Sequence, residues 1–116
     1  MEIHLKKDSL IVSDVPEIVA SNSREFKERV LAALTDGQKT IELDLSNTSF
    51  VDSSGLGSLI SLDKALRSRQ GLLRLRNPQQ SVLTILELTR LHRVFEVVVD
   101  SKPVPNGSAE DCSVAN

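Results

Sequence analysis

The chain has 116 residues, a length that suits a single domain with one hydrophobic core. Apolar residues make up 40% of the chain and its net charge is −2, and neither value indicates nucleic-acid binding. Trp and Tyr, which commonly stack on bases, are absent. No apolar run approaches the roughly 20 residues that a bilayer helix needs, and MEIHLKKD does not resemble a signal peptide, so we expect a cytoplasmic protein without membrane insertion.

The first fifteen residues predict a β-hairpin. Apolar Ile3 and Leu5 alternate with polar residues, the period of a half-buried strand. Residues 7–9 are typical of a turn, and residues 10–15 of a second strand. Pro16 cannot donate to a sheet ladder, so regular pairing should weaken there.

Three later segments predict helices. The first begins near Asn22, which with Glu25 resembles a capping box, and it should end at Gly37. The second is expected over about residues 54–69, and the third after Asn77-Pro78. Their predicted buried faces consist of Phe26, Val30, Ala33 and Leu34; of Leu56, Leu59, Ile60 and Leu66; and of Val82, Ile85, Leu86 and Leu88.

Strands are predicted over residues 40–45, 72–76 and 94–99. The resulting order, β-β-α-β-α-β-α-β, implies a sheet with parallel neighbours joined by right-handed crossovers and partly covered by helices. We assign residues 1–100 to the domain. The polar stretch 101–116 is expected to be a disordered tail, and its Cys112, the only cysteine, has no intramolecular partner for a disulfide.

The stretch VDSSGLGSL, residues 51–59, joins a predicted strand to the second helix. In open α/β sheets functional groups collect at the carboxyl ends of strands. Gly55 and Gly57 would let another molecule approach the backbone, and the helix start favours an anion. Ser53 or Ser54 would cap the helix. A simple N-cap remains an alternative interpretation of these residues, because Ser and Asp are common there.

Enzyme motifs fit poorly. A nucleophile elbow needs glycine where this chain has Val51, and a phosphate-binding loop motif is absent. The two histidines, His4 and His92, lie near a chain start and a helix end, where surface roles are commoner than catalysis. Asp44 and Asp52 could suggest a metal pair, but Asp44 alternates with apolar strand residues. We therefore predict no catalytic residue, metal or cofactor.

The stretch RSRQGLLRLRN carries four arginines. Basic patches can bind phosphates or nucleic acid. However, Arg67 and Arg69 lie at a helix end, where they complement the helix dipole, and Arg74 and Arg76 alternate along a strand. The pattern favours a solvated face.

The run LSNTSFVDSSGLGSL, after an apolar strand, resembles the hallmark of STAS domains of the anti-sigma factor antagonist type. Residues 85–97 are also similar to the third helix and last strand of that family, so the resemblance spans roughly residues 1–100. It implies an α/β fold with a mixed sheet of four or five strands and helices packed mainly on one side.

The resemblance also implies a function without enzymatic activity. Such proteins, when unphosphorylated, bind a serine-kinase anti-sigma factor, which then releases a sigma factor; the kinase phosphorylates the first serine after the aspartate, and a PP2C-type phosphatase reverses this. The phosphorylated residue here would be Ser53. The neighbouring and partner-binding residues would be Asp52, Ser54, Gly55, Leu56, Gly57, Ser58 and Glu17.

The N-terminal half departs from the family pattern. The family usually has the motif G-E-L-D before its first helix, and this chain has Pro16-Glu17-Ile18-Val19 there, so that Glu17 matches but the glycine and the aspartate are replaced. An alternative is a STAS subunit without a phosphate switch, serving as a regulatory or assembly piece of a larger complex such as a lipid-transport ATPase. The intact DSSG favours the first interpretation.

Overall fold

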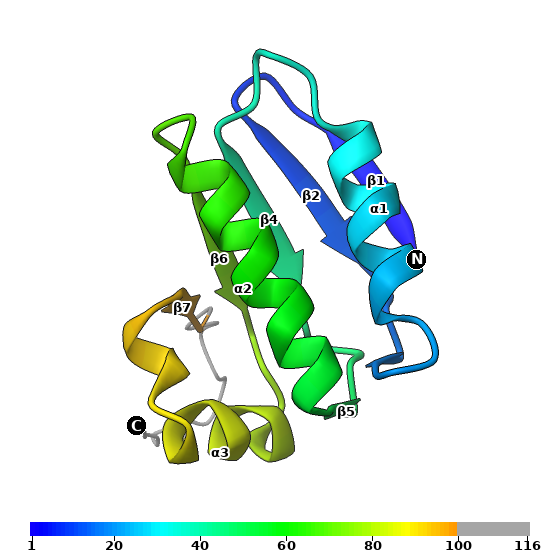
Figure 1. Ribbon diagram of the computed structural model, residues 1–116, viewed down its shortest axis with the longest axis vertical. Coiled ribbons are helices and arrows are strands. Elements are labelled where there is room, and N and C mark those ends of the chain that lie inside the picture. Colours follow the sequence, from blue (N-terminus) through cyan, green and yellow to red (C-terminus); the bar gives the residue numbers. More distant parts are fainter. Residues whose placement is uncertain (100–116) are drawn as a thin grey trace, which may run out of the picture.

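The computed structural model describes residues 1–99 (Figure 1). Its helices are α1 (Ser23–Ala33), α2 (Ser53–Arg67), α3 (Gln80–Leu88) and the 3-10 helix η1 (Leu91–Arg93). Its strands are β1 (Glu2–Leu5), β2 (Ser9–Ser13), β3 (Glu17–Ile18), β4 (Thr40–Asp44), β5 (Phe50–Val51), β6 (Leu72–Arg76) and β7 (Glu96–Val98). The tail predicted over residues 101–116 lies outside the described residues.

The main sheet has five strands in the order β1-β2-β4-β6-β7. β1 pairs antiparallel with β2, which confirms the predicted hairpin, and the other neighbours are parallel. The fold is therefore the expected α/β arrangement with a mixed five-stranded sheet. A second, two-stranded parallel sheet joins β3 to β5. These two short strands were not predicted.

Helices α1 and α2 lie side by side over one face of the main sheet, and α3 lies beyond one end of it (Figure 1). Residues of β2, β4 and β6 alternate between buried and half-buried positions, as expected for a sheet with one covered face. The fully buried large side chains are Leu10, Val12, Ile18, Ile41, Leu43, Leu45, Leu59, Leu62, Leu66, Leu73, Leu75 and Leu86.

The ends of α1 differ from the prediction. Asn22 occupies the N-cap position, but its side chain bonds outside the helix: Oδ1 accepts from the Val19 amide, and Nδ2 donates to the Glu17 carbonyl. The predicted capping box is therefore wrong. The helix ends at Ala33, because Leu34 takes an extended conformation, so Gly37 does not terminate it.

The C-terminal end of α2 also differs. The helix ends at Arg67, and Gln70 adopts the left-handed conformation (φ 64°) that closes it. The amide of Gly71 then donates to the Leu66 carbonyl at 2.7 Å, a Schellman-type ending. Glycine is required at residue 71 by a close contact and not by the helix ending, because a Cβ there would lie 1.6 Å from the Lys39 carbonyl oxygen.

Of the twelve predicted core residues of the helices, seven are buried. Ala33, Leu34, Ile60 and Ile85 are half-buried. Leu88 is 80% exposed, because it lies about 200° around α3 from the buried Leu86. The last strand is also shorter than predicted: β7 spans Glu96–Val98, and Val94 is the C-cap of η1, with helical dihedral angles.

Candidate functional site

The DSSGLG segment is placed by the small β3–β5 sheet. Ile18 pairs with Val51, and the Asp52 amide donates to the Ile18 carbonyl at 3.2 Å. Glu17 pairs with Phe50, and its side chain is exposed. The two segments that the sequence pattern singled out, around residue 17 and around residue 53, are therefore neighbours in space.

Asp52 is the N-cap of α2. Its Oδ1 accepts a hydrogen bond from the Gly55 amide at 2.8 Å, and its Oδ2 accepts one from the Ala20 amide at 3.0 Å. The bond from Gly55, with that from Ala20 adding to it, holds the pKa of the Asp52 carboxyl below its ordinary value. Ser53 and Ser54 follow the cap, so the prediction that one of them caps the helix is wrong.

Ser53 and Ser54 are the first two residues of α2, and both are exposed. Within residues 1–99, neither hydroxyl forms a hydrogen bond. The Asp52 carboxylate bonds to backbone amides and not to the Ser53 hydroxyl. The Ser53 oxygen is therefore open to another molecule.

The two glycines have different surroundings. Gly55 is buried, and a Cβ on it would lie 2.0 Å from the Ile18 carbonyl oxygen, so it allows α2 to approach β3. Gly57 is exposed, and a Cβ there would meet nothing within 4 Å. Only Gly57 fits the expectation that these glycines leave the helix start open.

Leu56 and Ser58 are both buried, each with 8% exposure. The Ser58 hydroxyl donates to the Gly55 carbonyl at 2.7 Å. Ser58 was expected among the residues next to the phosphorylation site and at the partner surface, and its side chain is buried. The exposed face of α2 passes through Gly57, Ser61 and Lys64. In this structure the accessible surface at the site comes from Ser53, Ser54 and Gly57.

Ala20 is the part of the site that the sequence did not indicate. Its amide bonds to a side chain 32 residues away. The contact depends on β3 and β5, which are two residues long and too short to show periodicity.

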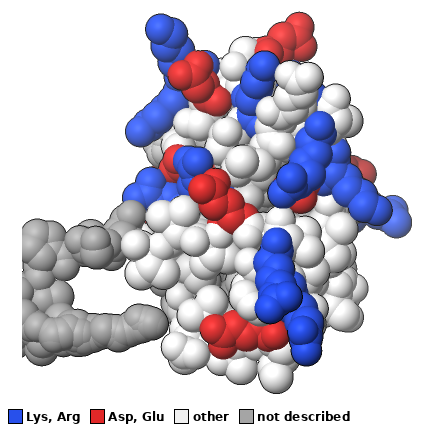
Figure 2. Space-filling model, turned by 90° about the vertical axis from the view of Figure 1, so that its left-hand side faces the viewer, with Lys and Arg blue, Asp and Glu red and all other residues white. Residues whose placement is uncertain are grey.

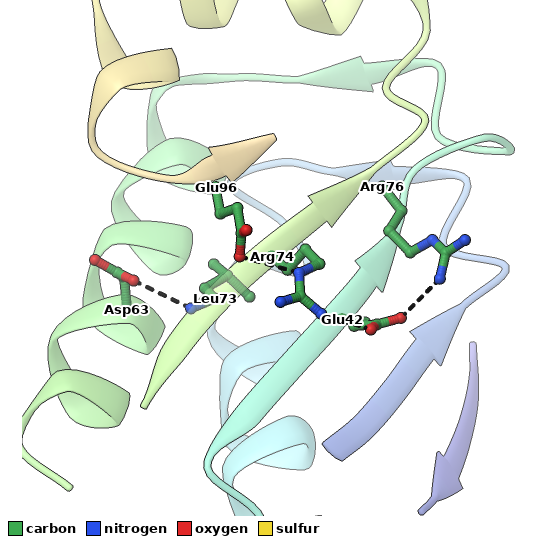
Figure 3. A network of polar contacts seen from close by, with 6 residues as sticks. All are labelled: Glu42, Asp63, Leu73, Arg74, Arg76 and Glu96. Atoms are coloured by element: carbon green, nitrogen blue, oxygen red, sulfur yellow. Dashed lines mark hydrogen bonds and ion pairs between the residues drawn. The ribbon is translucent and has the colours of Figure 1, made fainter. Parts of the chain in front are cut away.

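The arginines of the second candidate region are paired. Arg74 lies between Glu42 and Glu96, with nitrogen–oxygen distances of 2.8 and 3.0 Å, and Arg76 contacts Glu42 at 2.9 Å (Figure 3). Burial alone would raise the pKa of Glu42, but the hydrogen bonds and charges of Arg76 and Arg74 lower it overall. A solvated face was expected. Arg74 and Arg76 do lie on the side of the sheet away from α1 and α2 and are 31% and 34% exposed, but acidic side chains pair with both of them.

Acidic and basic side chains are interspersed over the surface seen in Figure 2, without a continuous basic patch on that face. Among residues 1–99 no group of three His, Cys, Asp or Glu side chains is placed to hold a metal ion. His4 contacts Glu2, and His92 contacts the Leu86 carbonyl, so neither is joined to a serine hydroxyl. No helix of the described part of the chain is long and apolar enough to cross a membrane.

Comparison with known proteins agrees with this geometry. The chain is 31% identical over 91 residues to a Thermotoga maritima protein described as a candidate anti-sigma factor antagonist, covering 78% of this chain and 80% of that protein. It is 30% identical over 81 residues to the anti-sigma-B factor antagonist of Listeria monocytogenes, covering 70% and 71%. The fold matches the anti-sigma factor antagonist SpoIIAA in its unphosphorylated form with a TM-score of 0.74, at 16% identity and with 97% and 98% of the two chains covered.

Residues 1–103 match the STAS domain family. The structure has the features that the resemblance implied: a mixed sheet, helices over one face of it, and the DSSG segment at the start of α2. The chain therefore belongs to the STAS domain family, and within it to the anti-sigma factor antagonists.

Proposed function

We propose that this protein is a phosphorylation-controlled binding switch of the bacterial cytoplasm. Its unphosphorylated form binds a serine-kinase anti-sigma factor, so that a sigma factor is released. The kinase transfers the γ-phosphoryl group of ATP to Ser53, which ends the interaction, and a PP2C-type phosphatase restores the free hydroxyl. The protein itself acts by binding and not by catalysis.

The observation that carries the proposal is the state of Ser53. It is exposed, directly follows the capping Asp52, and its hydroxyl has no partner within residues 1–99. A kinase can therefore reach the oxygen without unfolding the helix. The relative in Listeria monocytogenes, an anti-sigma-B factor antagonist, and the structure of SpoIIAA in a phosphorylated form both support the proposal.

Charge explains how the modification would act. A phosphoryl group adds about −1.5 to −2 charge at neutral pH. At the N-terminus of α2 the helix dipole favours this anion by roughly 0.3–1 kcal/mol, so the fold should tolerate it. A partner fitted to a neutral hydroxyl would instead meet a bulky anion, and such a mismatch can cost several kcal/mol. The partner would dissociate while the domain stays folded.

The test begins with affinity purification of the tagged chain and identification of a kinase-type partner. The purified pair is then incubated with ATP, and the phosphorylated residue is mapped by peptide mass spectrometry. Ser53→Ala should fold, resist phosphorylation and keep the partner bound. Ser53→Asp should fold and bind weakly.

Ser68→Ala is the matched control, because Ser68 is also an exposed serine but lies at the C-cap of α2, at the other end of the helix and outside the site. It should be phosphorylated and should bind like the wild type. Phosphate on Ser54 alone, or unchanged phosphorylation of Ser53→Ala, would contradict the assignment. Recovery of a membrane ATPase in place of a kinase would favour the alternative of a STAS subunit in a larger complex.

A further inference from the structure

A hollow of about 330 Å³ lies between α1 and α2, beside the proposed phosphorylation site. This groove is lined from α1 by a serine and two cations, and from α2 by three serines and a glycine: Ser23, Arg24, Lys27, Ser54, Gly57, Ser58 and Ser61. No carboxylate lines it. We propose that this groove receives an acidic segment of the partner, whose carboxylates pair with Arg24 and Lys27. This inference rests on the proposed function.

The two cations are available. Within residues 1–99 neither Arg24 nor Lys27 forms a hydrogen bond or an ion pair. By contrast, Arg67 and Arg74 are held by carboxylates at 2.8 Å. A ligand at Arg24 and Lys27 would not have to break an internal ion pair.

The α2 side of the groove leaves room for a peptide segment of the partner. Gly57 is exposed and has open space above its Cα, so a partner can approach the α2 backbone there. The hydroxyls of Ser54 and Ser61 are exposed on the same side and can donate to a carboxylate. The polar lining favours a charged segment over an apolar one.

The orientation of the helices adds to the positive potential. Both α1 and α2 begin at the same end of the molecule (Figure 1). The residues that line the groove lie near these two helix starts, with Ser61 about two turns along α2. Helix N-termini carry a partial positive charge. The carboxylate of the cap Asp52 has its oxygens on the amides of Gly55 and Ala20.

An acidic ligand would explain why phosphorylation ejects the partner. Ser53 lies one residue before Ser54, which lines the groove. A phosphoryl group on Ser53 would stand beside the same cations and repel the carboxylates of the incoming segment. The groove and the serine would thus form one electrostatic switch.

The test uses the isotope-labelled full chain and a capped hexaglutamate peptide as the probe, at low ionic strength, where screening is weak. NMR titration should shift the amides of residues 23–27 and 54–61. Arg24→Gln/Lys27→Gln should weaken the peptide's affinity about five- to tenfold, as expected for two exposed charge pairs. Ser53→Asp should also weaken it.

Arg29→Gln/Lys64→Gln is the matched control, because it removes two exposed cations from the same helices outside the groove. It should bind the peptide like the wild type. Equal loss in both double variants, shifts centred elsewhere, or no shifts would overturn the groove proposal. The experiment needs neither kinase nor partner, so its failure is distinct from a failure to find phosphate on Ser53.

Discussion

Gly55 lies against the backbone of Ile18, where a methyl group on Gly55 would stand 2.0 Å from the Ile18 carbonyl oxygen. Two backbone segments, the start of α2 and strand β3, are thus in direct contact. The contact brings Ala20 to Asp52 and holds the loop before α1 at the DSSG segment. It is a structural requirement, separate from any partner.

We expect Gly55→Ala and Gly57→Ala to change stability in opposite directions. Ala at residue 55 must displace the β3 backbone, at a cost of about 1–3 kcal/mol or more. At residue 57 the added methyl group meets open space in a helix interior, so stability should rise by about 0.5–1 kcal/mol. Urea denaturation of the two variants measures both effects, and equal effects would show that the contact of Gly55 is not tight.

Leu59→Ala should cost about 2–5 kcal/mol, because Leu59 is fully buried on α2 beneath the site. Ile60→Ala should cost less, since its side chain is half-buried. Lys64→Ala, on the exposed face, should stay within about 0.5 kcal/mol of the wild type. Thermal and chemical denaturation give this order, and a neutral Leu59→Ala would mean that the helix is rotated from the orientation described.

The sequence was most informative where a local period repeats. Leu73 and Leu75 alternate with Arg74 and Arg76, and one covered sheet face accounts for the pattern. The capping of α2 was harder to predict, because Asp52 and the two serines after it are all good caps. The structure shows a reason why Asp52 is the cap: the Ala20 amide donates to its second carboxylate oxygen, and a serine hydroxyl has no second oxygen to accept this bond.

Long-range contacts account for the other differences. The Arg74–Glu42 pair joins residues that are 32 positions apart and become neighbours only when β4 and β6 align. Alternation along β6 placed Arg74 on the open face correctly, but it carried no information about the acids opposite. Gly71 is required by the Lys39 carbonyl of a neighbouring segment, which no local pattern indicates.

The stability of the domain should fall in acid partly through Glu42. Its pKa is lower in the folded protein than its ordinary value of 4.5, so the unfolded chain takes up the proton first. The contribution is fully present above about pH 4.5 and is lost as the pH falls through the folded pKa. Glu42→Gln should therefore be less stable than the wild type at neutral pH, and the difference should shrink below about pH 4.5. Denaturation curves of the two proteins, recorded between neutral pH and about pH 3, measure this difference.

Removal of residues 101–116 should leave the melting temperature within a few degrees. So polar a segment offers little apolar area to bury. Differential scanning calorimetry of the full and shortened chains makes the comparison. A large loss of stability would place the domain boundary further along the chain.

Asp63 should matter for stability more than its ion-pair partner Arg67. Asp63 is 3% exposed, and its Oδ1 accepts a hydrogen bond from the Leu73 amide at 3.2 Å (Figure 3). Its Oδ2 accepts one from Arg67 Nε at 2.8 Å. Truncation of Asp63 to Ala leaves the buried Leu73 amide without an acceptor, which should cost about 1–3 kcal/mol.

Asp63→Asn separates the two contacts, because an amide oxygen can still accept from Leu73 while the charge pair with Arg67 is lost. Arg67→Ala removes the same ion pair from the other side, but its side chain is 58% exposed, so the loss should be about 1 kcal/mol or less. Urea denaturation should therefore rank Asp63→Ala as the least stable of the three. If Arg67→Ala were the most damaging, the ion pair and its bond to the Val94 carbonyl would hold α2 to the β6–β7 edge, and the backbone contact with Leu73 would be secondary.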